Sequence, residues 1–113
     1  MILPYRGEVW FGDLDPTIGH EQAGRRPVLV VSIDTLNQGP AGLVIVVPIT
    51  SRIRPVSSHV RLSPPEGGLR NESSVLCESV RSVSWKRLRE RWGVVTPRTM
   101  AAVSDRLRIL FSL

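Results

Sequence analysis

The sequence is poor in the features that mark disulfide-bonded, zinc-bound and membrane proteins. A single cysteine, Cys77, excludes an internal disulfide, and no cluster of cysteine and histidine has the spacing of zinc ligands. The longest nearly pure apolar run, residues 43–49, contains Pro48 and is far shorter than the roughly 20 residues of a bilayer-spanning helix. Because the N-terminus has no basic region followed by an apolar stretch, we expect no secretory signal and a cytoplasmic protein.

The motifs of several common enzyme classes are also missing. The sequence has no GxxxxGK or GxGxxG phosphate loop and no HExxH metal motif, so we expect neither a metal nor a cofactor. Cys77 has no histidine close in sequence and is interpreted as a buried apolar thiol within a strand. His20 and His59 lie far apart, and His59, at the start of a predicted strand, is interpreted as a surface or structural residue.

What the sequence does contain is a globular composition with an excess of arginine. Its 113 residues are 42% hydrophobic and 22% charged, which predicts one domain spanning residues 1–113. Fifteen basic residues against ten acidic ones give a net charge of +5, and only Lys86 among the fifteen is lysine. Arginine binds phosphate bidentately and stacks on bases, which favours a nucleic-acid partner. Codon use in a GC-rich genome explains the same composition equally well.

The pattern of elements predicts a mainly β (α+β) fold, a small antiparallel barrel with a C-terminal amphipathic helix. Thr96 followed by Pro97 is a good helix start, and apolar residues follow at helical spacing. Pro48 suggests that its strand lies at an edge or carries a bulge. A barrel of this size has a modest core, so we expect a homodimer. Strands are predicted at residues 8–14, 26–33, 43–50, 59–62, 74–85 and 92–95, helical turns at 34–38 and 85–89, and core positions of the helix at Met100, Val103, Leu107 and Leu110.

A loop of about ten residues, 15–24, separates the first two predicted strands, and a loop this long is more often functional than a bare connection. It is followed by Arg25 and Arg26 before Pro27. The proline restricts Arg26 to extended backbone, which fixes where its side chain leaves the chain. Fixed guanidinium groups beside a glycine-containing loop suit a phosphate ligand. A turn carrying a surface pair between arginine and Glu21 explains the same spacing.

Several short segments of the chain form a recognisable pattern: RGEVW at 6–10, DLDP at 13–16, GHEQ at 19–22, GRRPVLVVS at 24–32, Asn37, PITS at 48–51, Glu78, VRSV at 80–83, Arg87-Leu88 and the closing helix. Taken together, these segments resemble the MazF/PemK-type toxin endoribonucleases over essentially the whole chain. The resemblance implies a homodimeric SH3-like barrel of the CcdB/PemK type and a cognate MazE-like antitoxin. It also implies metal-independent, sequence-specific cleavage of single-stranded RNA, which inhibits translation and growth. The ribose 2′-hydroxyl attacks the adjacent phosphate and leaves 2′,3′-cyclic phosphate and 5′-hydroxyl ends.

The resemblance also implies roles for individual residues. Arg26 and Thr50 occupy the positions taken as catalytic. Since arginine keeps its proton in proteins, Glu21 or Glu78 is the more reasonable general base. Where some members carry an Arg-x-Asp pair, this sequence has Leu76 and Glu78. The candidate RNA-binding residues are His20, Gln22, Gly24, Arg25, Asn37, Ser51 and Arg81.

Two other functions fit the same fold. One is a non-catalytic gyrase poison, and the other is an RNA-binding module that has lost cleavage. The gyrase poisons end in Trp-Gly-Ile, whereas this chain ends in Ile-Leu-Phe-Ser-Leu and keeps Arg26 and Thr50. Trp85 and Trp92 are interpreted as packing residues. One of Trp10 and Phe11 should lie in the core, because they alternate faces of the first predicted strand.

Overall fold

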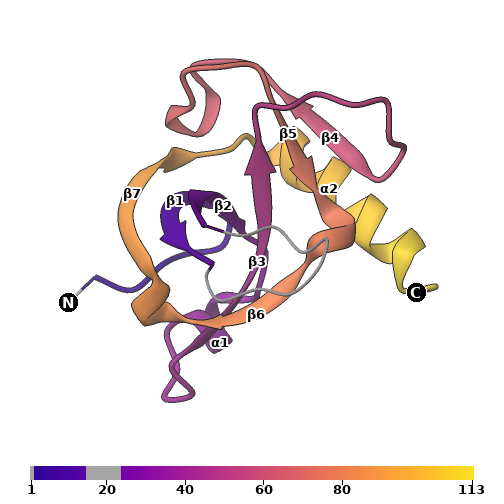
Figure 1. The fold of residues 1–113 in the computed structure, drawn as a ribbon. Helices are drawn as coiled ribbons and strands as arrows, with labels where there is room; N and C mark the ends of the chain where they lie inside the picture. Colours follow the sequence, from indigo (N-terminus) through magenta and orange to yellow (C-terminus); the bar gives the residue numbers. More distant parts are fainter. Residues whose placement is uncertain (1, 15–23) are drawn as a thin grey trace.

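The computed structural model describes residues 2–14 and 24–113, which form seven strands, two α-helices and short 3₁₀ turns. All strand pairs are antiparallel, and the sheet runs in the order β4-β5-β3-β2-β1-β7, with β6 also paired to β3. Figure 1 shows β6 and β7 curving around β1 and β2, with α2 on one side. The predicted antiparallel barrel with a C-terminal helix is confirmed. The elements are β1 (Glu8–Asp13), β2 (Arg25–Val30), α1 (Asp34–Asn37), β3 (Leu43–Thr50), β4 (His59–Leu62), β5 (Ser73–Leu76), β6 (Arg81–Ser84), β7 (Leu88–Val94) and α2 (Pro97–Leu110).

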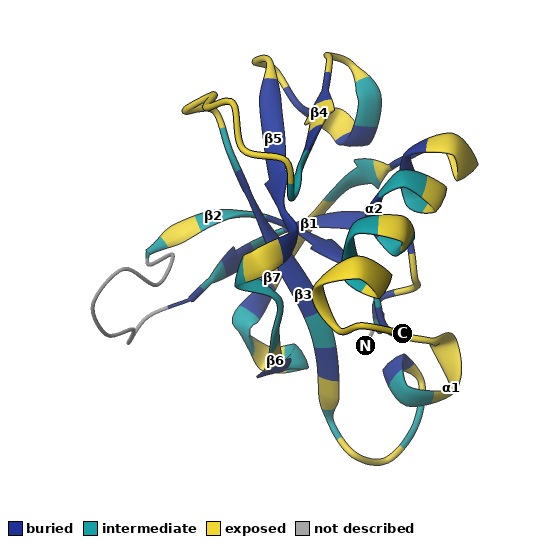
Figure 2. Cartoon of the chain, turned by 90° about the vertical axis from the view of Figure 1, so that its right-hand side faces the viewer, coloured by how far each residue is buried: buried dark blue, intermediate teal, exposed yellow. Residues whose placement is uncertain are grey.

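The apolar runs of β2 and β3 are continuous because both faces of these strands are buried. The buried residues form two core clusters. Val28 and Val30 belong to the first cluster, and Leu29 between them belongs to the second. The second cluster also contains Val47 of β3 and Val103 of α2, both fully buried. Figure 2 shows buried segments running through β3 and β5 at the centre of the molecule. The burial of β2 on both faces, predicted from its sequence, is confirmed.

Helix α2 begins as its sequence predicts. Thr96 caps it by accepting a hydrogen bond from the Thr99 backbone N–H at 3.2 Å, and Pro97 occupies the first turn. The Glu66 carboxylate accepts hydrogen bonds from the Thr96 N–H at 3.0 Å and the Thr99 hydroxyl at 2.6 Å. These bonds tie the helix start to the 3₁₀ turn Glu66–Gly68.

The rest of α2 is only partly core. Val103 is buried, and Met100 and Leu107 pack against the same core cluster. Leu110 is 44% exposed, so the prediction that it is a core residue is wrong. None of the helices in residues 2–14 and 24–113 has the length and apolar character needed to cross a membrane.

The prediction of a single strand at residues 74–85 is wrong. The chain forms β5, then a 3₁₀ turn at Cys77–Ser79, then β6. The two strands are separate because they pair with different parts of β3. Strand β5 pairs with Ile49 and Thr50 of β3, whereas β6 pairs with residues Leu43 to Val46 of β3. Cys77 therefore lies in the turn rather than within a strand. Its thiol is buried, as predicted, and burial raises its pKa to about 11.

The prediction of an edge or bulge at Pro48 is also wrong, because β3 lies inside the sheet. Pro48 pairs with Val28 of β2 on one side. On its other side, β6 pairs with β3 up to Val46 and β5 pairs from Ile49 onward. Pro48 falls between these segments, where a missing backbone N–H removes no bond of either ladder.

Candidate active site

Arg26 and Thr50 lie at the ends of neighbouring strands. Val28 of β2 pairs with Pro48 of β3, and the same register continued by two residues places Arg26 opposite Thr50. Side chains at directly opposite positions of an antiparallel pair lie on one face, with Cβ atoms about 4.5–5.5 Å apart. The two residues line two adjoining hollows together. The structure therefore brings together the two residues assigned as catalytic.

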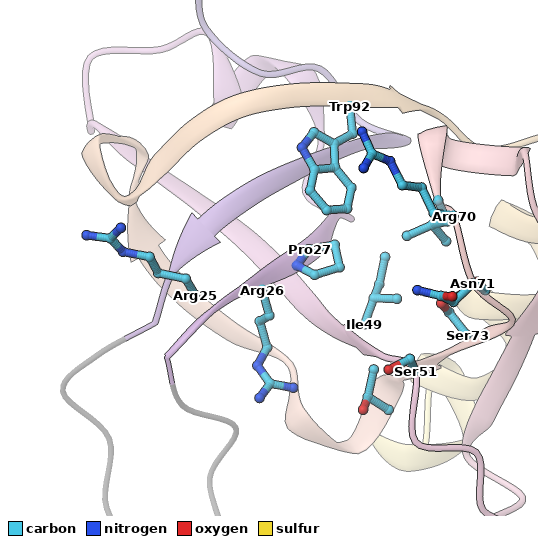
Figure 3. Close-up of a pocket in the computed structure, with 11 residues that line it drawn as sticks. Arg25, Arg26, Pro27, Ile49, Ser51, Arg70, Asn71, Ser73 and Trp92 are labelled. Carbon is cyan, nitrogen blue, oxygen red and sulfur yellow. The ribbon is translucent and has the colours of Figure 1, made fainter.

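The first hollow, called here the Trp92 hollow, has a volume of about 340 Å³. Figure 3 shows Arg26 and Ser51 at one end and Trp92 with Arg70 at the other. No acidic side chain of the described residues lines it, so this hollow favours an anionic ligand. Its lining residues are Arg25, Arg26, Pro27, Ile49, Thr50, Ser51, Leu69, Arg70, Asn71, Ser73 and Trp92.

The second hollow, called here the Glu78 hollow, has a volume of about 490 Å³. It combines arginines with one carboxylate, so it can both bind an anion and accept a proton. Arg52 and Arg54 are exposed on the segment that follows Thr50. Its lining residues are Arg26, Thr50, Arg52, Arg54, Val56, His59, Leu76, Glu78 and Ser79.

The Glu78 carboxylate is oriented by two neighbours. The Ser58 hydroxyl donates to one carboxylate oxygen at 2.6 Å, and His59 Nε2 lies 2.8 Å from the other. Partial burial works against ionisation of Glu78, but these hydrogen bonds and one from the backbone outweigh it and hold the pKa of Glu78 below its ordinary value. The group is therefore an ionised, aimed acceptor at neutral pH.

The Thr50 hydroxyl is oriented by the backbone. Its oxygen accepts a hydrogen bond from the Arg52 N–H at 3.1 Å. A hydroxyl that accepts in this way still carries its own hydrogen, which can be donated to a ligand oxygen. Beside it, Arg26 supplies a guanidinium, so one donor and one charged group face the same space.

Some predicted RNA-binding residues lie at the Trp92 hollow. Ser51 lines it directly. Arg25 lies at its rim with a 69% exposed side chain, 4.0 Å from the Asp13 carboxylate, and Figure 3 shows its guanidinium directed away from the other residues. Gly24 lines neither hollow; it precedes β2 with a φ of +76°, and its carbonyl accepts from the Leu14 N–H at 3.0 Å.

Other predicted residues lie elsewhere. Asn37 is 2% exposed, and its side-chain amide donates to the Ser32 carbonyl at 2.8 Å and to Asp34 at 3.1 Å, so it holds the turn around α1 together. Arg81 donates to the Leu14 carbonyl at 3.2 Å. Neither residue lines the two hollows. His20, Glu21 and Gln22 lie outside the described residues.

Sequence reasoning missed His59, Arg70 and Trp92 as site residues. His59 was interpreted as surface or structural, yet its side chain is only 7% exposed and contacts Glu78 within a site hollow. Nothing in its local sequence signals this contact, which depends on the pairing of β4 with β5. The arginines after Thr50 carried a signal, because they follow the predicted catalytic threonine within four residues.

The fold and the site define a class of protein: a small antiparallel β-barrel with a cationic site that bears an oriented hydroxyl and an ionised carboxylate. In the part of the chain that is described, no three side chains of His, Cys, Asp and Glu gather as a metal site. The family of PemK-like, MazF-like toxins of type II toxin-antitoxin systems matches residues 5–111. The chain belongs to this family.

Individual relatives agree over the whole length. The chain is 31% identical to endoribonuclease EndoA of Bacillus subtilis, covering 99% of this chain and 97% of that protein. It is similar to the crystal structure of MazF from Deinococcus radiodurans, with a TM-score of 0.90, 31% identity and full coverage of both chains. A MazE-MazF structure from the same organism matches with a TM-score of 0.79 and 28% identity, over 100% of this chain and 99% of that one.

Proposed function

We propose that this protein is the endoribonuclease toxin of a type II toxin-antitoxin system and cleaves single-stranded RNA at specific short sequences in the cytoplasm. The observation that carries the proposal is the meeting of Arg26, Thr50 and the ionised Glu78 around one hollow. The net charge of +5 fits a polyanionic substrate, and the relative EndoA is named an endoribonuclease.

The reaction proposed is an internal transesterification. The ribose 2′-oxygen forms a bond to the adjacent phosphorus while the bond from phosphorus to the 5′-oxygen breaks, which leaves a 2′,3′-cyclic phosphate and a 5′-hydroxyl end. The transition state carries excess negative charge on the phosphate oxygens. The Arg26 guanidinium neutralises this charge and the Thr50 hydroxyl donates to the same oxygens. No metal ion takes part in the proposed steps.

The proton of the 2′-hydroxyl needs an acceptor. Arginine keeps its proton in proteins, so Arg26 is a poor base. Glu78 is ionised and lines the hollow, and we assign the proton to its carboxylate. The departing 5′-oxygen takes a proton from water. Glu21 is the rival base, and its substitution serves as a separate arm of the test.

The proposed partners follow the family. Solved relatives include complexes of MazF with MazE, and we propose that a MazE-like antitoxin inhibits this protein. A homodimer is proposed because α2 ends in exposed apolar side chains, with Ile109 69%, Leu110 44% and Phe111 57% exposed. Sedimentation at micromolar concentration should give twice the chain mass, and a purely monomeric protein would contradict the dimer.

The central test is cleavage of a labelled, unstructured RNA by purified protein in the presence of a chelator. Wild-type protein should cut, and the fragments should carry 2′,3′-cyclic phosphate and 5′-hydroxyl ends. Arg26→Ala should lower the single-turnover rate by at least about 10²–10³-fold, the usual cost of losing one oriented stabilising group. Circular dichroism should show an unchanged fold. A wild-type rate in Arg26→Ala would overturn the assignment of Arg26.

Matched variants separate the remaining possibilities. Arg98→Ala removes an exposed arginine of α2 outside both hollows and should leave the rate unchanged. Glu78→Gln should lower the rate by about 10²-fold, as expected for loss of a general base. A normal rate in Glu78→Gln with a slow Glu21→Gln would move the base to Glu21. Tight RNA binding without any cleavage would instead favour an RNA-binding module.

A further inference from the structure

Trp92 occupies an irregular position in the pairing of β1 with β7. Between Val9 and Trp10 the register moves one residue on β1 but two residues on β7, from Gly93 to Arg91. Trp92 is therefore the extra residue of a β-bulge, a feature that re-aims a side chain and is common beside active sites. The bulge places the indole at the Trp92 hollow.

The indole is held in a fixed orientation on one side. Its ring stacks on the Phe11 ring with centroids 5.3 Å apart and an angle of 13° between the planes. The side chain is half-buried, and it lines two hollows, the Trp92 hollow and a neighbouring one of about 380 Å³. An aromatic ring that is fixed by a neighbour and reaches open space is preorganised to stack on a ligand.

Two close backbone contacts made by glycines place Arg70 beside the Trp92 indole. A Cβ on Gly68 would lie 2.3 Å from the Trp92 carbonyl oxygen, and one on Gly93 would lie 2.7 Å from the carbonyl carbon of Gly67. Because these positions are glycine, the 3₁₀ turn Glu66–Gly68 packs directly against β7. The chain that leaves the turn then carries Arg70 beside Trp92, as Figure 3 shows.

Arg70 is the cation that suits a phosphate here. Arg91 lines the neighbouring hollow too, but its guanidinium pairs with the Glu8 carboxylate at 2.5 Å, and Glu90 adds a negative charge beside it. None of the ion pairs among residues 2–14 and 24–113 involves Arg70, and its side chain is exposed.

We propose that Trp92 and Arg70 form a nucleotide subsite, in which the indole stacks on a nucleobase and the guanidinium binds the phosphate of an RNA nucleotide beside the cleaved bond. This inference rests on the proposed cleavage at Arg26 and Thr50, which line the same hollow, with Arg26 at the end opposite Trp92 (Figure 3). Stacking on aromatic rings together with arginine contacts to the backbone is how single-stranded RNA is held. The subsite touches no reacting atom, so it acts on RNA affinity and not on the chemical step.

The test uses RNA that binds but is not cut, with a 2′-deoxy nucleotide at the mapped cleavage position. A series of oligonucleotides is lengthened one nucleotide at a time on each side, and affinity is measured by fluorescence anisotropy. With wild-type protein, one added nucleotide should tighten binding by about tenfold, the usual effect of one stacked base. An abasic residue at that position should abolish the gain.

Variants assign the gain to the two residues. Trp92→Leu should abolish the gain and leave the affinity of the shorter RNA unchanged, and Trp92→Phe should retain most of it. Trp85→Leu is the matched control, because Trp85 packs against the other core cluster. Arg70→Ala should weaken binding of the longer RNA and make it less sensitive to salt, whereas Arg89→Ala, at the other bulge of β7, should not.

The outcomes distinguish this inference from the proposed function. Wild-type protein that cleaves RNA but gains no base-dependent affinity from any added nucleotide overturns the subsite. This comparison needs only wild-type protein and abasic RNA, so it holds even if a Trp92 variant fails to fold. A protein that cleaves no RNA overturns the endoribonuclease, and the same affinity series is then run on unmodified RNA. A base-dependent gain that Trp92→Leu abolishes in that series still supports the subsite.

Discussion

The two hollows that meet at Arg26 and Thr50 have different chemistry. Among the described residues that line the Glu78 hollow there is one carboxylate, Glu78, which Ser58 and His59 orient, whereas those that line the Trp92 hollow include an aromatic ring and no acid. A carboxylate can take a proton but repels a phosphate, and an aromatic ring can hold a base but cannot take a proton. In the proposed mechanism, proton transfer and strand binding are therefore separated on either side of one pair of residues.

The largest expected effect concerns Thr50, which belongs to both hollows. Thr50→Val keeps the branched shape but removes the hydroxyl, so kcat should fall about 10²–10³-fold while KM changes little. Single-turnover and steady-state kinetics on one RNA would measure both quantities. An increase in KM with normal kcat would show that Thr50 binds the strand rather than the transition state. That result would contradict the assignment of a catalytic role to the residue that the two hollows share.

A smaller effect is expected from a substitution that disturbs the Trp92 hollow and leaves the Glu78 hollow unchanged. Gly68→Ala places a Cβ 2.3 Å from the Trp92 carbonyl at a φ of +72°, so the turn must move away from β7. We expect unfolding in urea to be easier by about 2–3 kcal/mol. RNA affinity should weaken while the chemical step of bound RNA persists.

Gly24→Ala is the matched control for this change. Gly24 has a φ of +76°, and a Cβ at this position would meet no described atom within 4 Å, so only the backbone conformation opposes alanine there. Gly24→Ala should lower the free energy of unfolding by about 1 kcal/mol. Equal costs at both positions would mean that the contact with Trp92 does not constrain the turn.

The smallest expected effect is on the pH dependence of stability at the Glu78 hollow. The pKa of Glu78 lies below its ordinary value of 4.5 in the folded protein, so its contribution is present above about pH 4.5 and is lost as pH falls through the lower folded value. The melting temperature of wild-type protein should exceed that of Glu78→Gln at pH 7, and the difference should shrink at pH 3. A difference that persists at pH 3 would indicate packing rather than ionisation.

The sequence predicted those parts of the fold that depend on short-range patterns. The run in β2 identified a strand buried on both faces, residues 43–50 were correctly predicted as a strand, and the Thr96-Pro97 pair marked the start of α2 correctly. The break between β5 and β6 was missed because it depends on which half of β3 each strand meets. That choice is made by contacts far apart in the sequence, and the strand itself shows only an imperfect alternation.

The site was predictable to a similar extent. Pro27 next to Arg26 indicated a fixed guanidinium, and the family resemblance added Thr50 and Glu78. His59 and Trp92 were not predicted to line the hollows, because their positions there depend on the pairing of β4 with β5 and on a bulge between β1 and β7. Trp92 does pack against a core cluster, as predicted. The amide of Asn37 matched the family pattern, yet it is buried in hydrogen bonds to Ser32 and Asp34, which local sequence does not reveal.

The position of β3 has a consequence for control of the protein. This strand pairs with β2, β5 and β6, and Thr50 is its last residue, paired with Ser74. Moving the backbone that carries Thr50 would separate ladders that hold both cores, which requires a large share of the global unfolding free energy. The backbone at Thr50 therefore keeps its position for as long as the protein is folded. An inhibitor of the proposed reaction would therefore have to cover the two hollows rather than move the backbone that carries Thr50.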